Sequence, residues 1–244
     1  MGYYTVKVKP TIAASIQNAE AFASGEVLFD WTGFEIPRGS GKLVSAAAII
    51  KPKGDAAPTQ NAFPFQLLFA SNNDISLGTV GAAADRRPNS NITGMIEFPA
   101  TSFGPTSMRS TAVASTSNST VGGHAPLVVA PDVDEPATTG YHKIYVGCIA
   151  AGNFNFTSIN AINEADFGAG TQTVITMDGS GMDVREHFAP GNVLHAQDDA
   201  VLGTVKTADT STQITLTAAN TDAIAEDDII FDVNPITLVF GFED

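Results

Sequence analysis

Short apolar or alternating runs recur along the whole chain, and turn-forming residues separate them. Residues 27–36 and 41–50 are two such runs, and each ends close to a proline. Residues 63–70 are unusually rich in large apolar side chains, which is typical of a strand in the centre of a sandwich. The same pattern predicts further strands, at residues 4–9, 92–98, 126–130, 142–150, 153–157 and 236–242.

Helices are poorly supported. Residues 11–24 allow either one short helix or an irregular strand, and residues 158–167 suggest one helical turn. The strand of residues 4–9 ends at Pro10, which favours a place near a sheet edge. Roughly eight to ten strands without long helices predict an all-β fold, a β-sandwich or jelly roll. An α/β fold is excluded because helices between the strands are missing.

The C-terminal part contains a denser pattern of short β-pieces. Small polar residues at 191–192, 198–199, 209–211 and 226–228 separate them and favour tight turns. The pieces are residues 193–195, 201–205, 213–217 and 229–231.

The flanks of this part, residues 172–177 and 235–242, both look like strands of a larger sheet. We therefore expect a small β-barrel-like module, residues 185–234, inserted before the last strand of a main β-sandwich domain. That main domain is expected to comprise residues 1–184 and 235–244.

Charge is distributed unevenly. The net charge is −14, and 13 of the 26 acidic residues lie in residues 178–244, against only Arg185 and Lys206. Direct binding of nucleic acid needs clustered Lys or Arg, so it is excluded for the module. The basic residues are scattered, and half of them lie toward the N-terminus, which is the end that an acidic partner, if one exists, would contact: Lys7, Lys9, Arg38, Lys42, Lys51 and Lys53.

Known catalytic and metal-binding motifs are missing. No G-x-S-x-G elbow, phosphate-binding loop or paired histidine spacing occurs, although carboxylate pairs that meet only in space stay open. Residues 178–183 only superficially suggest a calcium loop and are interpreted as a Gly-rich turn. Cys148 lies in an apolar run and is expected to be buried. The sequence thus predicts no enzyme, no metal and no cofactor.

Targeting and membrane patterns are also missing. The first ten residues lack a secretory signal and a myristoylation pattern, and no apolar run has the length of a membrane span. We therefore expect a protein that does not contact a membrane and that either is soluble or leaves its cell by a route other than a signal peptide.

Residues 191–235 carry Gly203-Thr204-Val205, then Thr-Gln-Ile-Thr-Leu-Thr at 212–217, then Asp227-Asp228-Ile229-Ile230. In this spacing they resemble small β-modules in virion structural proteins of tailed, particularly marine, bacteriophages. The remaining chain resembles such proteins in composition: it is acidic, rich in Ser, Thr and Ala, and has one cysteine.

Among virion proteins, a β-sandwich of this size resembles capsid decoration (cement) proteins. The resemblance implies a homo-oligomer, a trimer above all, made in the host cytoplasm and bound on the capsid surface to the major capsid protein or other virion proteins. On this hypothesis we expect the partner interface at the N-terminal arm and the aromatic strand ends: Tyr3, Tyr4, Lys7, Lys9, Trp31 and Phe34.

Two alternatives stay open. One is a tail, baseplate or head-fibre component whose inserted module forms a tip. The other is a carbohydrate-binding β-sandwich that uses Trp31 or Tyr141 as a stacking platform.

Overall fold

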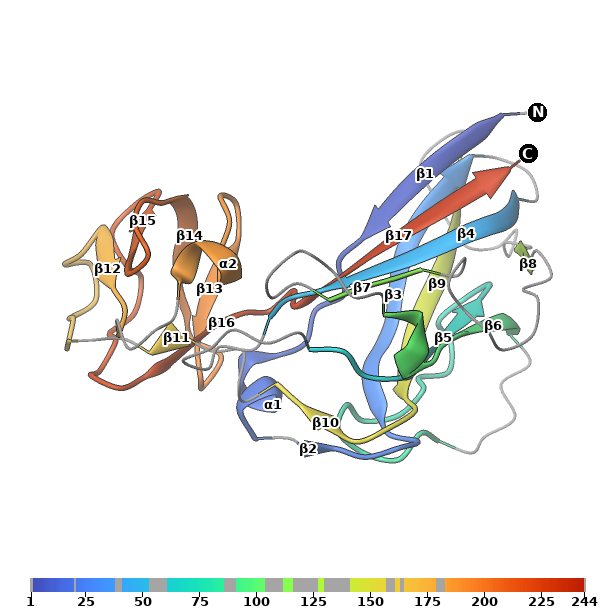
Figure 1. Ribbon diagram of the computed structural model, residues 1–244, viewed down its shortest axis with the longest axis horizontal. Coiled ribbons are helices and arrows are strands. Elements are labelled where there is room, and N and C mark those ends of the chain that lie inside the picture. Colours follow the sequence, from blue (N-terminus) through green and yellow to red (C-terminus); the bar gives the residue numbers. More distant parts are fainter. Residues whose placement is uncertain are drawn as a thin grey trace.

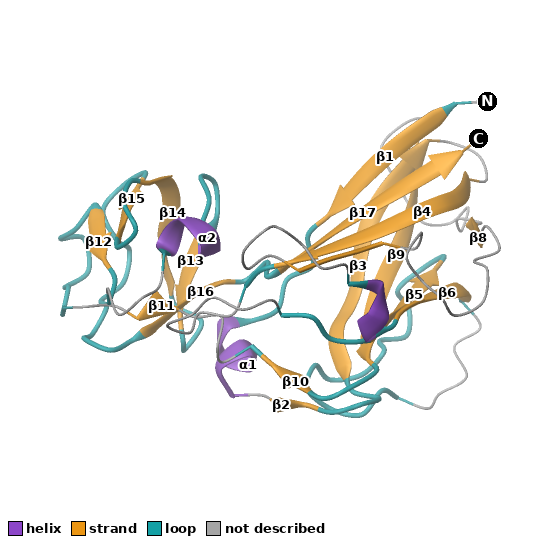
Figure 2. Cartoon of the chain, viewed as in Figure 1, coloured by secondary structure: helices purple, strands orange, loops and turns teal. Residues whose placement is uncertain are grey.

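The computed structural model describes the chain except for residues 1, 20, 38–40, 53–60, 86–90, 104–111, 116–126, 130–140, 157–160, 163–164, 179–182 and 244. Almost all of its elements are strands, paired in antiparallel sheets, so the predicted all-β class is confirmed (Figures 1 and 2). The strands gather in two lobes. We call residues 2–156 with 236–243 the larger lobe and residues 161–235 the smaller lobe.

The first sheet of the larger lobe contains the first and the last described strands. Its order is β1-β17-β4-β7, and β8 also pairs with β4. Among the described strands β1 pairs only with β17, which confirms the predicted edge position. The strands are β1 (Tyr3–Val8), β4 (Gly41–Ile50), β7 (Ala112–Ser115), β8 (Leu127–Val129) and β17 (Ile236–Glu243).

The second sheet packs against the first. Its order is β3-β9-β5-β6, and β5 lies inside it, as the apolar run of residues 63–70 predicted. The strands are β3 (Val27–Pro37), β5 (Phe65–Ala70), β6 (Ile92–Phe98) and β9 (Tyr141–Ala150).

Aromatic rings fill the space between these two sheets. Phe34 of β3 stacks on Phe240 of β17 with ring centroids 5.3 Å apart, and Phe69 of β5 meets the same ring edge-on. Both sheets contribute to one continuous buried cluster. Large side chains suit this position because facing sheets lie about 10 Å apart.

Smaller elements close one end of this sandwich (Figure 2). Strand β2 (Ala21–Phe22) pairs with β10 (Phe154–Asn155), and the rings of Phe22 and Phe154 stack 5.0 Å apart. Residues 11–24, where the sequence left two alternatives, form helix α1 (Ala14–Ala19) and then β2. One turn of 3-10 helix, η1 (Ala100–Ser102), follows β6.

The smaller lobe is built on a single six-stranded sheet in the order β11-β16-β13-β14-β15-β12. The four strands predicted at 193–231 are confirmed, and two of their turn residues, Asp199 and Asp227, have positive φ of 73° and 66°. The elements are β11 (Ala161–Ile162), β12 (Val174–Thr176), α2 (Val184–His187), β13 (Val193–Ala196), β14 (Val201–Ala208), β15 (Gln213–Leu216) and β16 (Ile229–Asp232).

Three expectations for this part of the chain are wrong. Residues 172–177 do not join the larger sheet, because β12 pairs with β15 and buries Ile175 in the core of the smaller lobe. The chain of this lobe therefore begins well before residue 185. Residues 161–162 form a strand and no helical turn, and the described strands form an open sheet, since β11 and β12 pair only with β16 and β15.

The last strand lies where the sequence placed it. Strand β17 pairs with β4 along its whole length, so the chain leaves the larger lobe after β10 and returns at β17. The buried cluster of the smaller lobe contains only residues between 167 and 230. Each lobe thus has its own core.

Candidate interaction surfaces

A lysine at the end of β4 joins the two lobes. Lys51 Nζ forms an ion pair with Asp232, donates to the carbonyl oxygen of His187 at 2.6 Å and donates to Asn192 Oδ1 at 3.1 Å. Burial lowers the pKa of Lys51, while the Asp232 carboxylate acts in the opposite direction. Asp232 keeps only 2% of its side chain exposed, so loss of Lys51 would leave a buried carboxylate without its cation.

Helix α1 and the segment before it add a second set of contacts to the smaller lobe. Gln17 Nε2 donates to the carbonyl oxygen of Asp232 at 3.0 Å, and Asn234 Nδ2 donates to that of Pro10 at 2.9 Å. The Ser15 amide and hydroxyl donate to the Asp199 carboxylate at 3.0 and 2.5 Å. The junction therefore fixes the smaller lobe against the larger one at several points, as Figure 1 shows around α1 and β16.

The Asp199 carboxyl group responds to this contact. Its partial burial disfavours the charged form, but the hydrogen bonds from Ser15 outweigh this and lower its pKa. The hydrogen bonds from Ser15 therefore stabilise the ionised form of Asp199 at the contact between the lobes.

The outer face of the first sheet is an open surface in the described part of the chain. On β1 exposure alternates, so Tyr3, Thr5 and Lys7 point outward while Val8 is buried. Exposed apolar side chains continue across β4 at Val44 and Ile49, each more than a third exposed. Exposed aromatic and apolar side chains that gather on one face are typical of a protein interface.

Tyr3 lies flat across this face. Its hydroxyl group is 3.3 Å from Ser45 Oγ on β4, so the ring crosses the intervening strand β17. The crossing depends on Gly241, because a Cβ atom there would collide with the Tyr3 and Ser45 hydroxyl groups. No sequence pattern indicates Ser45 or Gly241, because their roles depend on strand order.

The predicted interface residues divide into two groups. Tyr3, Lys7 and Lys9 are exposed on or next to β1, as expected for a contact surface. Tyr4, on the opposite face of the strand, is half-buried and stacks on Phe242 with centroids 5.4 Å apart. Phe34 is buried between the two sheets, so its expected role at a surface is wrong.

Trp31 lies away from these residues, beneath the loop that follows β5. Its indole nitrogen donates to the carbonyl oxygen of Ile75 at 2.7 Å, and its ring lies over Gly147 of β9. The loop is held further by Asp30, which accepts hydrogen bonds from Ser76 and Leu77. These contacts make Trp31 part of a small half-buried cluster, whereas Tyr141 is 46% exposed.

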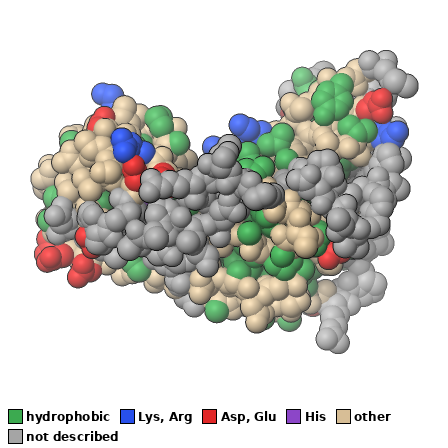
Figure 3. Space-filling model, viewed as in Figure 1, with side chains coloured by type: hydrophobic (Ala, Val, Ile, Leu, Met, Phe, Trp, Pro, Cys, Tyr) green, Lys and Arg blue, Asp and Glu red, His purple; other side chains and the backbone are tan. Residues whose placement is uncertain are grey.

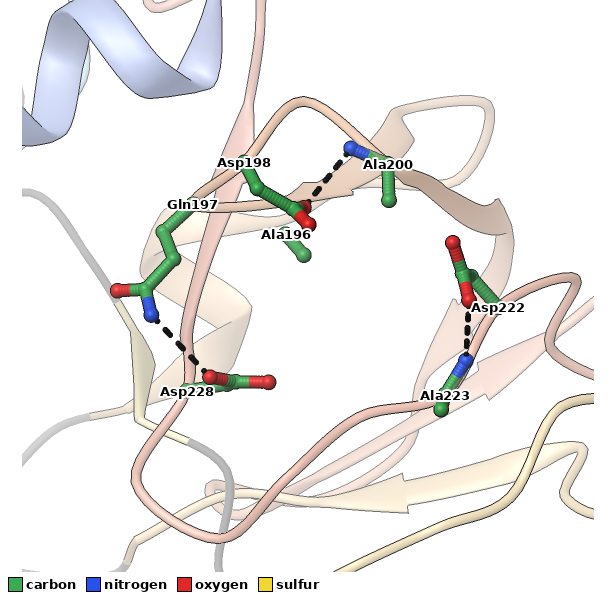
Figure 4. A pocket seen from close by; sticks show the side chains of 7 residues that line it. All are labelled: Ala196, Gln197, Asp198, Ala200, Asp222, Ala223 and Asp228. Carbon is green, nitrogen blue, oxygen red and sulfur yellow. Dashed lines mark hydrogen bonds between the residues drawn. The ribbon is translucent and has the colours of Figure 1, made fainter.

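An acidic pocket of about 270 Å³ lies in the smaller lobe beside the β13–β14 turn (Figure 4). Each of its carboxylates already accepts a hydrogen bond: Asp198 from the Ala200 amide, Asp222 from the Ala223 amide and Asp228 from Gln197. These aspartates therefore stabilise turns. In the part of the chain that the structure describes, no group of three His, Cys, Asp or Glu side chains could hold a metal ion.

The remaining candidate groups are dispersed. His187 is buried, and His195 Nδ1 lies 3.0 Å from the carbonyl oxygen of its own turn residue Asp199. Cys148 is buried as predicted, and burial raises the pKa of its thiol well above the ordinary value. His124, the acidic residues 132–135 and residues 179–182 of the calcium-like stretch lie outside the described residues.

Asp183, at the end of that stretch, has a structural role. It caps α2 by accepting the Arg185 amide at 3.0 Å and pairs with the Arg185 guanidinium group. Its carboxylate is therefore engaged within its own helix.

Surface charge differs between the lobes. Figure 3 shows a group of Asp and Glu side chains at the far end of the smaller lobe, while in this view both lobes also carry basic and further acidic side chains. Among the described residues, no helix has the length and apolar composition that crossing a membrane requires.

Comparisons with known proteins found no strong match for this chain. No family model and no curated protein matches the chain. The crystal structure of the STIV MCP, a major capsid protein, aligns over 99% of this chain and 97% of that chain at 11% identity, with a TM-score of 0.16. Likeness to a viral capsid protein is thus very weak, and the fold assignment rests on the strand pairing described above.

Proposed function

We propose that this chain is a non-enzymatic structural protein of a virus particle, a capsid decoration (cement) protein that binds the outer surface of the shell. The observation that carries the proposal is the separation of two surfaces. The larger lobe offers an open sheet face with Tyr3, Val44, Ile49 and Lys7, while the acidic residues concentrate in the smaller lobe.

Because its two surfaces differ, the molecule would bind the shell in one orientation. The open sheet face suits the shell, because exposed apolar and aromatic side chains on one face favour contact with another protein. The acidic lobe then points outward, where its charge repels released nucleic acid. The contacts of Lys51 and Ser15 hold the smaller lobe in this orientation relative to the larger lobe.

Charge reversal of the N-terminal arm tests the proposal. The chain is coexpressed with the shell protein of the same genome, and retention on assembled shells is measured by gradient sedimentation. Lys7→Glu with Lys9→Glu is expected to reduce retention about tenfold, or ~1.4 kcal/mol. Lys206→Glu, an exposed lysine on the smaller lobe, is the matched control and should bind normally.

Equal retention of both variants would remove the arm from the shell contact. Absence of the unmodified chain from shells would overturn the decoration role. The separate core of the smaller lobe favours a second candidate, a tip on a tail, baseplate or head fibre. In that case the chain would sediment with tail structures or with fibres.

A further inference from the structure

One cluster at the junction of the lobes brings an amine, an amide and a carboxylate together. Lys51 follows the end of β4, which Figure 1 shows running toward the smaller lobe. Its Nζ atom is paired with the Asp232 carboxylate and lies 3.1 Å from Oδ1 of Asn192. Because a C=O bond is about 1.23 Å long, Nζ is at most about 4.3 Å from Cγ, the carbonyl carbon of Asn192. A nucleophile, an electrophilic carbon and a base therefore lie side by side.

The surroundings of Lys51 favour the neutral amine, which is the nucleophilic form of lysine. Burial is the largest influence and lowers the pKa of Lys51, the Asp232 carboxylate acts in the opposite direction, and the charge of Lys9 lowers the pKa further. The Phe188 ring, with its centroid 5.6 Å from Nζ, covers the amine. Asp232 accepts a hydrogen bond from Nζ and is placed to take a proton from it. A buried lysine in contact with a base is an activated nucleophile.

The Asn192 amide is fixed in a position that suits attack. Its side chain is buried, and Oδ1 accepts a second hydrogen bond, from the backbone amide of Ala189 at 2.7 Å. A backbone N–H directed at this oxygen stabilises the negative charge that develops on it when an amine adds to Cγ. Lys51 follows β4 and Asn192 precedes β13, so only the folded chain brings the two groups together.

We propose that Lys51 and Asn192 join through an amide bond between their side chains, with Asp232 transferring the protons. Asp232 accepts one proton from the Lys51 ammonium group, and the freed lone pair of Nζ forms a bond to Cγ of Asn192. As the Cγ–Nδ2 bond breaks, Nδ2 takes a second proton from Nζ and leaves as ammonia, which the proton on Asp232 converts to ammonium. The step needs no oxidant and no further reactant. The new amide keeps one N–H, which can still donate to the carbonyl oxygen of His187.

Asn192 is a better acceptor for this bond than Asp232. Attack on a carboxyl group needs its protonated form and a second base, and among the described residues Asp232 supplies the one carboxylate in contact with Lys51. The ion pair forms on folding and holds the junction until the amide bond replaces it.

The bond would tie the two lobes together covalently. It would span 141 residues of a chain whose single cysteine rules out an internal disulfide. A cross-link over such a long loop stabilises a protein mainly by restricting its unfolded state.

Mass spectrometry of the purified chain tests the proposal. After incubation at neutral pH, we expect the intact mass to fall below the sequence mass by one ammonia, whereas Asn192→Ala should keep its full sequence mass. Trypsin cleaves after Lys or Arg but not before Pro, so digestion should yield residues 43–53 joined to residues 186–206. Fragmentation of this product is expected to place the link between Lys51 and Asn192.

Asp232→Asn tests the role of the carboxylate, since it keeps the shape of the side chain and removes the base. The rate of linkage is expected to fall about a hundredfold or more, while circular dichroism shows the same fold. Linkage at the original rate would overturn the role of Asp232 in proton transfer.

Other results with the unmodified chain would overturn the bond itself. One is an unchanged mass, with the two peptides recovered separately. Another is loss of ammonia without joined peptides, which a cyclic imide at an asparagine produces. A third is loss of water with Lys51 joined to residue 232. None of these results depends on shell binding, so the linkage can fail while the proposed function stands.

Discussion

The two lobes bury different kinds of side chain. Phenylalanines dominate the core of the larger lobe, whereas the smaller lobe is filled mainly by Ile, Leu, Val and Met side chains, with Phe188 as the one buried phenylalanine of its cluster. Two facing sheets leave a space about 10 Å wide that rings fill, whereas the core of the smaller lobe is enclosed by a single sheet together with Val184 of α2. The difference indicates two units that fold around separate cores and depend on each other only at the junction.

Truncation of a core side chain in either lobe is expected to have the largest effect on stability. Phe240→Ala is expected to destabilise the larger lobe by about 3–5 kcal/mol, and Leu202→Ala the smaller lobe by about 2–5 kcal/mol. Both side chains are fully buried. The single tryptophan, Trp31, lies in the larger lobe, so denaturant unfolding followed by its fluorescence should respond to Phe240→Ala far more than to Leu202→Ala. Equal shifts would mean that the lobes unfold as one unit.

Breaking the junction should have the next largest effect. Asp232→Ala leaves the Lys51 ammonium without its carboxylate and is expected to cost about 2–3 kcal/mol. This lies below the range for a fully buried pair because Lys51 keeps 22% of its side chain exposed. Hydrogen exchange of the amides in β13 and β16 would measure the loss. The double variant Lys51→Met with Asp232→Ala is the control and should recover much of the stability, since no charge is then stranded.

Local features of both lobes could be predicted from the sequence, but their partners could not. Asp199 and Asp227 were placed in turns because short polar side chains tolerate positive φ. Strand β12 was assigned to the wrong sheet, since an apolar alternation shows which face is buried and not against which strand. The alternation of Phe34, Glu35 and Ile36 did contain the signal that Phe34 is buried.

The contacts between the two lobes could not be predicted from sequence patterns. Lys51 is bound by groups 136, 141 and 181 residues away along the chain. No spacing rule links such positions, and a single lysine next to a proline gives no sign of burial. Ser45 and Gly241 were missed for the same reason, because their contact with Tyr3 exists only once β17 lies between β1 and β4.

The smallest expected effect concerns the pH dependence of the junction. The pKa of Asp199 is lowered in the folded state, so its contribution to stability is present above its ordinary pKa of 3.8 and is lost as the pH falls through the lowered value. Asp199→Asn should therefore cost about 0.5–1 kcal/mol at neutral pH and progressively less under acid conditions. Denaturant unfolding of both proteins at a series of pH values checks this. Ser15→Ala removes the hydroxyl donor and should reproduce part of the effect with the same pH trend. A constant difference between the curves would show that Asp199 acts through its shape and that its ionisation is irrelevant to the contact between the lobes.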